Sequence, residues 1–278
     1  MNLYYTQHPH GILCGSQLIG EASDQGCRMA EHKGALYAAY LGEGDVIKLI
    51  TRQAASEREW TTLETARRSS GVPALFSFND TLYMAYRNAQ NLTVLCRYVE
   101  PSNTLVTVSQ MSDRLSQTPA FAVLNGTLHM FYKAHDSANL FHKTTTNLSS
   151  WRRRPVIKSD GQATALSHLS PVAATYQNLI HLIYSDRESG HCFLLKSDGT
   201  NWTSRIPLIN QSYPHSPGLT VHDGLLTLAF AGQDNALHQY TYDGHCVSAP
   251  VASTLLTCAP VSPTLAVQDG QLTAVFSQ

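Results

Sequence analysis

Side chains that could bind a polar ligand gather in several short, variable segments of the chain. These segments read RNAQN, KAHDSAN, SDRESGH and AGQDNA, and each follows an alternating run typical of a β-strand. Acids, bases, amides and imidazoles on exposed loops can hydrogen-bond a ligand, although any single one could equally be a solvated turn residue. The candidate ligand-binding residues are Arg87, Lys133, His135, Asp136, Asp186, Arg187, Glu188, Gln233 and Asp234.

The elements that carry these segments recur along the chain. One residue can be taken as a marker in each of six units, and successive markers are separated by 46, 46, 52, 46 and 46 positions. Nine residues after each marker comes Leu or Ile, and four residues later comes Tyr or Phe. A fixed period of this length indicates a repeat architecture. The markers are Cys27, Pro73, Pro119, Pro171, Pro217 and Pro263.

Each unit reads as strands only. A first run ends in a two-residue turn such as Asn125-Gly126 or Asp223-Gly224, and an alternating run follows, which is typical of a type I′ hairpin. A third and a more variable fourth strand come next. Four antiparallel strands in about 46 residues match one blade of a propeller. The sequence therefore predicts an all-β, six-bladed β-propeller of four-stranded antiparallel blades.

The sixth unit supplies only two strands before Gln278. The amino-terminal segments 2–11 and 12–20 match the missing third and fourth strands. We therefore expect one blade to be closed by pairing of N-terminal strands with C-terminal strands. The expected single domain, 1–278, has blades at approximately 27–72, 73–118, 119–170, 171–216, 217–262, and 263–278 plus 1–26.

Strand order assigns the loops to two faces. Hairpin turns between first and second strands share one face with the turns between third and fourth strands. The loops between second and third strands share the other face with the crossovers to the next blade. All nine candidates lie on this second, variable face. The six-residue excess in the crossover 156–171 could wall a pocket there, or could be an ordinary tolerated insertion.

Composition excludes several classes of function. Charged residues make up 14% of the chain and the net charge is −1, so a basic stripe for nucleic acid is absent. No run approaches the 18 apolar residues of a membrane span, and no classical signal peptide is recognised, which leaves a cytoplasmic location or a non-classical export route open. The six cysteines form no CxxC pair and the thirteen histidines are scattered, which favours packing roles. We expect no metal and no cofactor.

Propeller enzymes place charged side chains on the inner strands. A glycosidase needs a pair of acids, and a calcium-dependent lactonase needs inward carboxylates and amides. The inner-strand segments ALFSF, AFAVL, VAATY, GLTVH and TLAVQ contain no arginine and no acid. We therefore expect a central channel without charged groups, no catalytic residues and no enzyme activity.

Two features carry a resemblance to a known family. The stretch KSDGTNWTS (196–204) resembles the Asp-box, but Asp198 directly precedes Gly199, which departs from the motif. The repeat as a whole resembles the lectin-type and sialidase-like β-propellers, with tachylectin-like architecture. The resemblance covers nearly the whole chain and rests on turn and packing motifs. It implies that Trp60, Trp151 and Trp202 pin turns against neighbouring blades, with an aromatic sugar platform as the alternative.

The resemblance also implies a function. It predicts a carbohydrate-binding protein whose partners are glycans or a glycoprotein surface, recognised through shallow pockets, and a targeting module of a larger secreted or toxin assembly. The alternative is a protein-protein docking platform that uses the same face without sugar affinity. A hydrolase is the least favoured interpretation, because clustered acids in the channel are not recognised.

Overall fold

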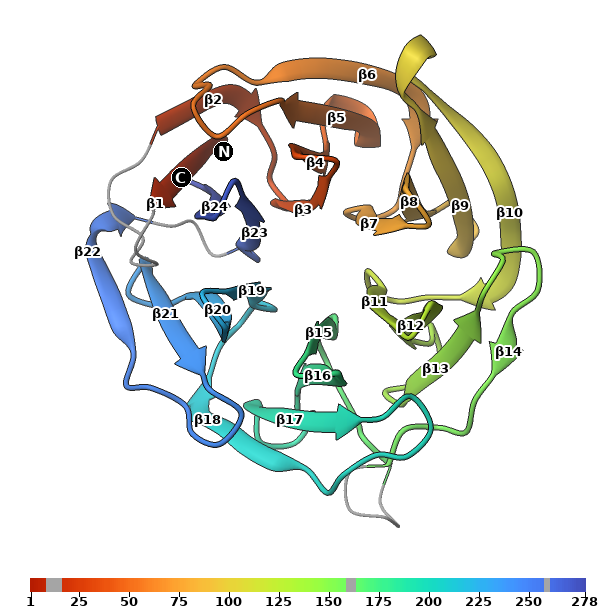
Figure 1. Ribbon diagram of the computed structural model, residues 1–278, viewed down its shortest axis with the longest axis vertical. Coiled ribbons are helices and arrows are strands. Elements are labelled where there is room, and N and C mark those ends of the chain that lie inside the picture. The colour runs from red at the N-terminus through yellow and green to blue at the C-terminus, as the bar shows by residue number, and fades with distance from the viewer. Residues whose placement is uncertain (9–16, 159–163, 258–260) are drawn as a thin grey trace.

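The computed structural model describes residues 1–8, 17–158, 164–257 and 261–278. It contains six four-stranded sheets with consecutive antiparallel pairing, arranged as wedges around a central axis (Figure 1). The protein is a six-bladed β-propeller, as predicted. In the described residues, no helix is long and apolar enough to cross a membrane, and the two helical segments are the single turns η1 (Glu43–Asp45) and η2 (Glu100–Ser102).

The first strand of each unit lies nearest the axis and the fourth lies at the rim. Blades 1 and 2 comprise β3 (Cys27–His32), β4 (Ala35–Leu41), β5 (Val46–Arg52) and β6 (Thr61–Arg68), then β7 (Ala74–Phe78), β8 (Thr81–Arg87), β9 (Leu92–Val99) and β10 (Thr104–Arg114). Blades 3 and 4 comprise β11 (Ala120–Leu124), β12 (Thr127–Lys133), β13 (Leu140–Thr145) and β14 (Arg152–Arg153), then β15 (Val172–Tyr176), β16 (Leu179–Ser185), β17 (His191–Ser197) and β18 (Ile206–Ser212). Blades 5 and 6 comprise β19 (Gly218–His222), β20 (Leu225–Ala231), β21 (Ala236–Tyr242) and β22 (Val251–Thr257), then β23 (Thr264–Gln268), β24 (Gln271–Ser277), β1 (Asn2–His8) and β2 (Gln17–Ala22).

The hairpin turns between first and second strands have the predicted chemistry. Both central residues of all six turns have positive φ, as in Asn125 (49°) and Gly126 (70°). This conformation defines the type I′ turn, whose twist matches that of the flanking strands. Most positions that lack glycine use Asn or Asp, for example Asn79 and Asp80, since these residues tolerate the left-handed region; the exceptions are Lys33 and Gln177. These turns form what we call the tight-turn face.

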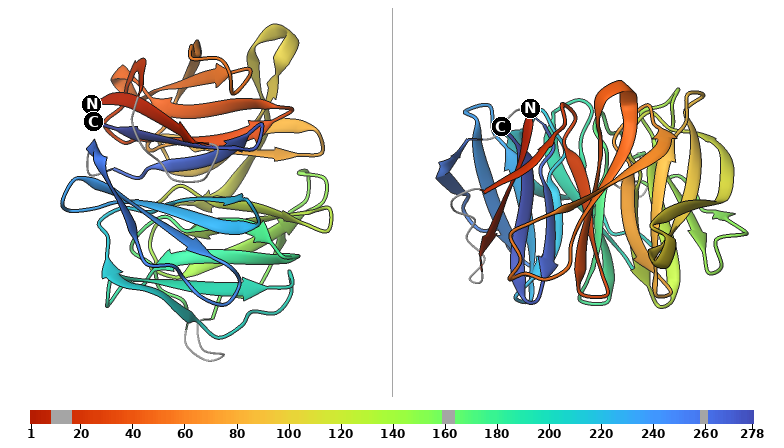
Figure 2. Two further views of the ribbon diagram at one scale, coloured as in Figure 1. Left: turned by 60° about the vertical axis from the view of Figure 1, so that its left-hand side comes forward. Right: turned by 90° about the horizontal axis from the view of Figure 1, so that it is seen from above.

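The ring is closed where the two ends of the chain meet. Strand β1 pairs with β24 in antiparallel register from Leu3–Ser277 to His8–Leu272. At the end of this pairing, Asn2 and Gln278 exchange main-chain hydrogen bonds of 3.2 and 3.0 Å. Both termini therefore lie together on one face of the ring (Figure 2). The prediction that blade 6 is assembled from both ends of the chain is confirmed, and residues 9–16 of the expected third and fourth strands lie outside the described residues.

Arg52 joins the two halves of blade 6 from the neighbouring blade. Its side chain is fully buried. The guanidinium donates to Gln7 Oε1 on β1 (2.9 Å), to Gln268 Oε1 on β23 (3.0 Å) and to Thr273 Oγ1 on β24 (3.1 Å). It also lies 5.1 Å from the ring centroid of Tyr5, which suits a cation-π contact. One cation thus bridges the amino-terminal and carboxy-terminal strands.

The apolar core lies between the blades. One cluster, for example, packs Ile183 and Leu194 of blade 4 against Leu226 and Phe230 of blade 5. This arrangement follows from strands that are buried on both faces, since each blade can cover its sheet only with its neighbours.

The three tryptophans pack against the preceding blade, as expected. Trp202 of blade 4 makes edge contacts with Phe131 and His142 of blade 3, Trp60 contacts Tyr5 of blade 6, and Trp151 packs on a cluster that includes residues of blade 2. Asp198 accepts hydrogen bonds from the main-chain N–H groups of Thr200 and Asn201, so it stabilises its own turn.

Candidate functional site

Each second strand has an aromatic residue near its end, and in several blades this residue contacts the preceding blade. In three junctions a charged side chain from the rim strand of that preceding blade lies 19 positions earlier in the sequence. The pairs are Glu21 with Tyr40, Arg67 with Tyr86, and Asp113 with Tyr132. Arg67 Nη1 donates to Tyr86 Oη at 3.1 Å, and Tyr132 Oη donates to Asp113 Oδ1 at 2.9 Å. These polar pairs lie near the variable face, because both strands end there.

The Asp113 carboxylate accepts hydrogen bonds from three side chains. Its side chain is 6% exposed and accepts hydrogen bonds from Tyr132, from Lys143 Nζ, and at 3.3 Å from Arg153 Nη2. Burial alone would raise its pKa. The hydrogen bond and positive charge of Lys143, followed by the contributions of Tyr132 and Arg153, outweigh burial and hold the pKa of the Asp113 carboxyl below its usual range.

Asp113 lies in a pocket between blades 2 and 3. The pocket has a volume of about 390 Å³, and we call it the junction pocket. Its aromatic wall is Tyr132 with Phe141, whose rings stack at a centroid separation of 5.6 Å. The Arg153 side chain is 70% exposed, so its remaining N–H groups can reach a ligand. The lining residues are Ser112, Asp113, Arg114, Tyr132, Ala134, His135, Asp136, Ser137, Phe141 and Arg153.

Two of the nine predicted residues belong to this pocket. His135 and Asp136, in the loop between β12 and β13, are exposed and line it. The main-chain N–H of His135 donates to the carbonyl of Arg114, which ties this loop to the rim strand of blade 2. The pocket therefore combines residues of the predicted loop with residues of the preceding blade.

Two further predicted residues hold the crossovers in place. The Arg87 guanidinium donates to the carbonyls of Ser70 (2.7 Å), Ser116 (3.0 Å) and Leu115 (3.3 Å), and burial lowers its pKa. Lys133 Nζ donates to Ser116 Oγ at 3.0 Å, and burial together with the charge of Arg187 lowers its pKa. Both cations therefore donate hydrogen bonds to the crossover segments that support the variable face.

The remaining predicted residues lie in two other loops of that face. Asp186 Oδ2 accepts from Ser189 N (3.0 Å), and its Oδ1 lies 3.7 Å from Arg205 Nη1. The neighbouring Arg187 and Glu188 are exposed. In the next blade, Asp234 pairs with His238 Nε2 at 3.0 Å, which is the main reason that its pKa is lowered, and Gln233 is exposed. The nine residues are thus distributed over four loops.

Sequence reasoning overlooked the residues contributed by the rim strands. A regular signal was available, because Glu21, Arg67 and Asp113 all stand six residues before a marker and are separated by 46 positions. Phe141 and Arg153 stand 22 and 34 residues after the marker Pro119. The same offsets from Pro171 hold Phe193 and Arg205 in blade 4, so a recurring signal was available for this pair as well.

The central channel differs from the expectation of an uncharged lining. Arg28, the second residue of β3, lines the pocket on the axis together with Pro119, Pro171, Pro217 and Pro263. Burial lowers the pKa of Arg28, and its Nη1 donates to the carbonyl of Cys27 at 3.1 Å. The prediction was wrong for blade 1 because it considered five inner strands and omitted CRMAEH, the divergent first copy.

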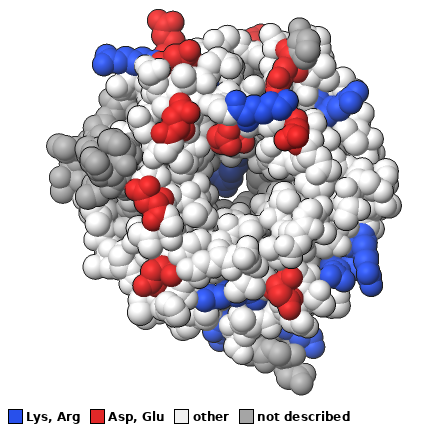
Figure 3. All heavy atoms as spheres, viewed as in Figure 1, with Lys and Arg blue, Asp and Glu red and all other residues white. Residues whose placement is uncertain are grey.

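The surface is sparsely charged. Acidic and basic side chains are scattered over the face in Figure 3 with wide uncharged areas between them. Within the described residues, no group of three His, Cys, Asp or Glu side chains is placed to hold a metal ion. The lining of the junction pocket offers hydrogen-bonding groups and an aromatic surface.

Comparisons with known proteins identify the fold. No protein-family model matches the sequence, and no curated protein matches it significantly. Among solved structures, a variant of the AofleA protein of Arthrobotrys oligospora with three arginines replaced by alanine has 9% sequence identity and a TM-score of 0.73. The alignment covers 99% of this chain and 83% of that chain.

Two further structures show the range of proteins with this architecture. The fungal lectin of Aleuria aurantia, a six-bladed β-propeller described with its fucose recognition mode, has 11% identity, a TM-score of 0.63, and coverage of 87% of this chain and 83% of that chain. An α-L-arabinofuranosidase of Clostridium thermocellum has 12% identity, a TM-score of 0.58, and coverage of 84% and 94%. At such identities the similarity concerns the fold.

Proposed function

We propose that the protein binds carbohydrate and that the junction pocket between blades 2 and 3 is a saccharide site. The observation that carries this proposal is the buried Asp113 carboxylate, held by Tyr132, Lys143 and Arg153 at the edge of a stacked aromatic pair. A site that orients a polyhydroxylated ligand needs fixed polar groups beside an apolar surface, and this pocket contains both.

Each part of the pocket has a distinct role in this proposal. The exposed N–H groups of Arg153 donate to sugar hydroxyls, and the Asp136 carboxylate accepts from them. Phe141 offers a partly exposed ring against which the apolar face of a sugar ring packs. Asp113 and Lys143 fix the position of Arg153 and Tyr132, so the site is organised before the ligand arrives.

The fold comparisons support this function over the alternatives. Lectins recur among the similar structures, including a fungal lectin with a fucose recognition mode. A docking platform would use the same variable face, and the role of a targeting module in a secreted or toxin assembly remains part of the proposal. The Asp-box and tachylectin-like relationship also belongs to the proposal, since the packing of Trp202 and the capping by Asp198 are compatible with it.

The test is a glycan array probed with the purified protein, with a pull-down and a panel of chromogenic glycosides run in parallel. We expect binding to a defined subset of glycans, competition by the free sugar, and no glycoside turnover. Capture of a protein partner without any glycan signal would favour the docking platform, and sustained turnover would favour a hydrolase. Either result would overturn the proposed function.

A further inference from the structure

The residue that precedes each tight turn reaches across to the next blade. In three junctions this position forms a hydrogen bond to a main-chain carbonyl of the next blade's turn. Tyr176 Oη donates to Gly224 O (2.8 Å), His222 Nε2 lies 3.1 Å from Gly270 O, and Gln268 Nε2 donates to Gly34 O (2.8 Å). Tyrosine, histidine and glutamine all perform this bridging role, so its purpose is structural.

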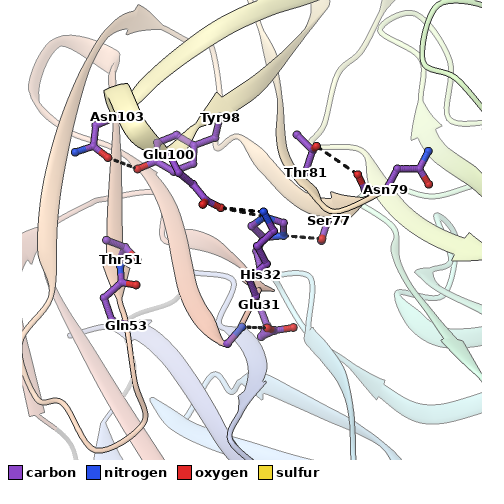
Figure 4. Close-up of polar contacts among 12 residues, drawn as sticks. Glu31, His32, Thr51, Gln53, Ser77, Asn79, Thr81, Tyr98, Glu100 and Asn103 are labelled. Carbon is purple, nitrogen blue, oxygen red and sulfur yellow. Dashed lines mark hydrogen bonds and ion pairs between the residues drawn. The ribbon is translucent and has the colours of Figure 1, made fainter.

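His32 occupies the same position in blade 1 but contacts side chains. Its Nδ1 lies 2.8 Å from Ser77 Oγ on β7, and its Nε2 lies 3.3 Å from Glu100 Oε1 of η2 (Figure 4). The histidine and the serine come from adjacent blades, and the glutamate comes from the turn between the third and fourth strands of blade 2. The junction between blades 1 and 2 therefore replaces a main-chain contact with a hydroxyl–imidazole–carboxylate chain.

The carboxylate fixes the proton on the imidazole. Glu100 can only accept a hydrogen bond when ionised, so Nε2 of His32 carries the proton and Nδ1 is left as the acceptor for the Ser77 hydroxyl. Burial and the charge of Lys33 lower the pKa of His32, against the opposing effects of Glu100 and Glu31, so the ring is a neutral base at pH 7. The imidazole is buried, with a side chain 2% exposed, whereas Ser77 is exposed on the tight-turn face.

We propose that Ser77 is a nucleophile activated by His32, with Glu100 as the residue that positions the imidazole and stabilises its protonated form. In the first step Ser77 Oγ forms a bond to the carbonyl carbon of an ester while its proton passes to His32 Nδ1. The bond from that carbon to the leaving oxygen then breaks, and the leaving oxygen takes the proton from Nδ1. Water releases the acyl group by the same sequence, so the reaction requires only an ester and water.

The surroundings of Ser77 define the substrate class. The hydroxyl lies on an open surface, beside polar side chains of the neighbouring turn such as Asn79 and Thr81, and none of the junction-pocket residues takes part. This suits a small acyl ester carried on a larger polar molecule, because the acyl group needs no deep pocket. The site lies on the face opposite the variable loops and is independent of the proposed saccharide site.

The proposal is tested with a fluorophosphonate probe and with p-nitrophenyl acetate. Both reagents should modify Ser77, as shown by mass spectrometry of the labelled peptide. General-base assistance contributes about 10²–10⁴-fold, so His32→Gln should slow labelling by at least about 100-fold. This substitution is compatible with the fold, since Gln268 occupies the equivalent position in blade 6. Glu100→Gln should slow labelling about tenfold and shift the half-maximal pH downwards, because Glu100 raises the pKa of His32.

Two matched variants control for structural effects. His222→Gln alters the equivalent position in blade 5, where the partner is a carbonyl, and should leave the labelling of Ser77 unchanged. Thr175→Ser places a serine at the position equivalent to Ser77, where the Thr175 hydroxyl donates to Val123 O. Because the preceding blade has Leu124 at the position of His32, this serine should not be labelled. Failure to modify Ser77 in the native protein, or equal labelling in His32→Gln and the native protein, would overturn the proposal.

Discussion

Tyr132 donates a hydrogen bond of 2.9 Å to the carboxylate of Asp113, which belongs to the rim strand of the preceding blade. This contact links two blades and also forms the back of the junction pocket. Stability and the proposed ligand binding therefore depend on the same pair. Their separation in the sequence, 19 residues, is preserved by charged residues in two other junctions, where the charged residue is an acid, Glu21, in one and a base, Arg67, in the other.

The strength of this contact can be measured with a double-mutant cycle. Tyr132→Phe and Asp113→Asn should each lower the free energy of unfolding, by about 1 kcal/mol for the lost hydrogen bond and somewhat more where Lys143 loses its charged partner. Their effects should couple by about 0.5–1.5 kcal/mol, since the residues share one bond. Urea denaturation of the four proteins provides the values. Additive effects would show that the hydroxyl and carboxylate do not interact.

The stability of the ring closure, where β1 pairs with β24, should depend on Arg52. Arg52→Met should destabilise the protein by about 2–4 kcal/mol, because it leaves the buried acceptors on Gln7, Gln268 and Thr273 without their donor. Hydrogen exchange should accelerate first in β1 and β24, the strands that meet at the closure. The matched control is Arg97→Met, since Arg97 is exposed on β9. Uniformly faster hydrogen exchange in all blades would contradict a local role of Arg52 at the ring closure.

The general architecture could be predicted because it follows from local rules repeated six times. Type I′ turns at positions such as Asn125-Gly126 fix the register of each hairpin, and the marker spacing fixes the number of blades. The pairing of β1 with β24 followed from counting strands, without any knowledge of side-chain contacts. These features follow from the repeat of about 46 residues, which can be recognised within one sequence.

The site was only partly predictable because it depends on contacts between blades. His135 and Asp136 were recognisable as polar loop residues, yet Asp113 and Arg153 reach the same pocket from different rim strands. The same limitation concealed the chain formed by Ser77, His32 and Glu100, because none of the three is unusual within its own segment of the sequence. Arg28 in the central channel was also overlooked, because the sequence of blade 1 diverges from the repeat.

Two histidines buried in blade 3 make stability depend on pH. His129 Nδ1 and His142 Nε2 lie 2.9 Å apart. Burial, together with the charge of Arg154, lowers the pKa of His129 to about 4; burial, together with His129 and Arg154, lowers the pKa of His142 to about 3. The unfolded chain binds protons near the usual pKa of about 6.5, whereas the folded protein does not.

The consequence is a loss of stability on acidification. The free energy of unfolding is unaffected by this pair above about pH 7, and should fall by about 5 kcal/mol as the pH decreases from 6.5 to 4, because each of the two imidazoles costs up to about 1.4 kcal/mol per pH unit. The double variant His129→Thr, His142→Leu uses residues found at the equivalent positions Thr227 and Leu194, and should show a flatter pH profile. Thermal denaturation at several pH values gives both curves. Parallel curves would show that the pair does not titrate in this range.

The most direct test of the proposed function is calorimetric titration of one glycan, selected from the array, against the native protein and three variants. Arg153→Ala and Phe141→Ala remove the polar and aromatic parts of the junction pocket, and each should weaken binding at least tenfold, equivalent to about 1.4 kcal/mol. Arg97→Ala, exposed on another strand, should bind as the native protein does. Unchanged affinity in both pocket variants would contradict a saccharide site between blades 2 and 3.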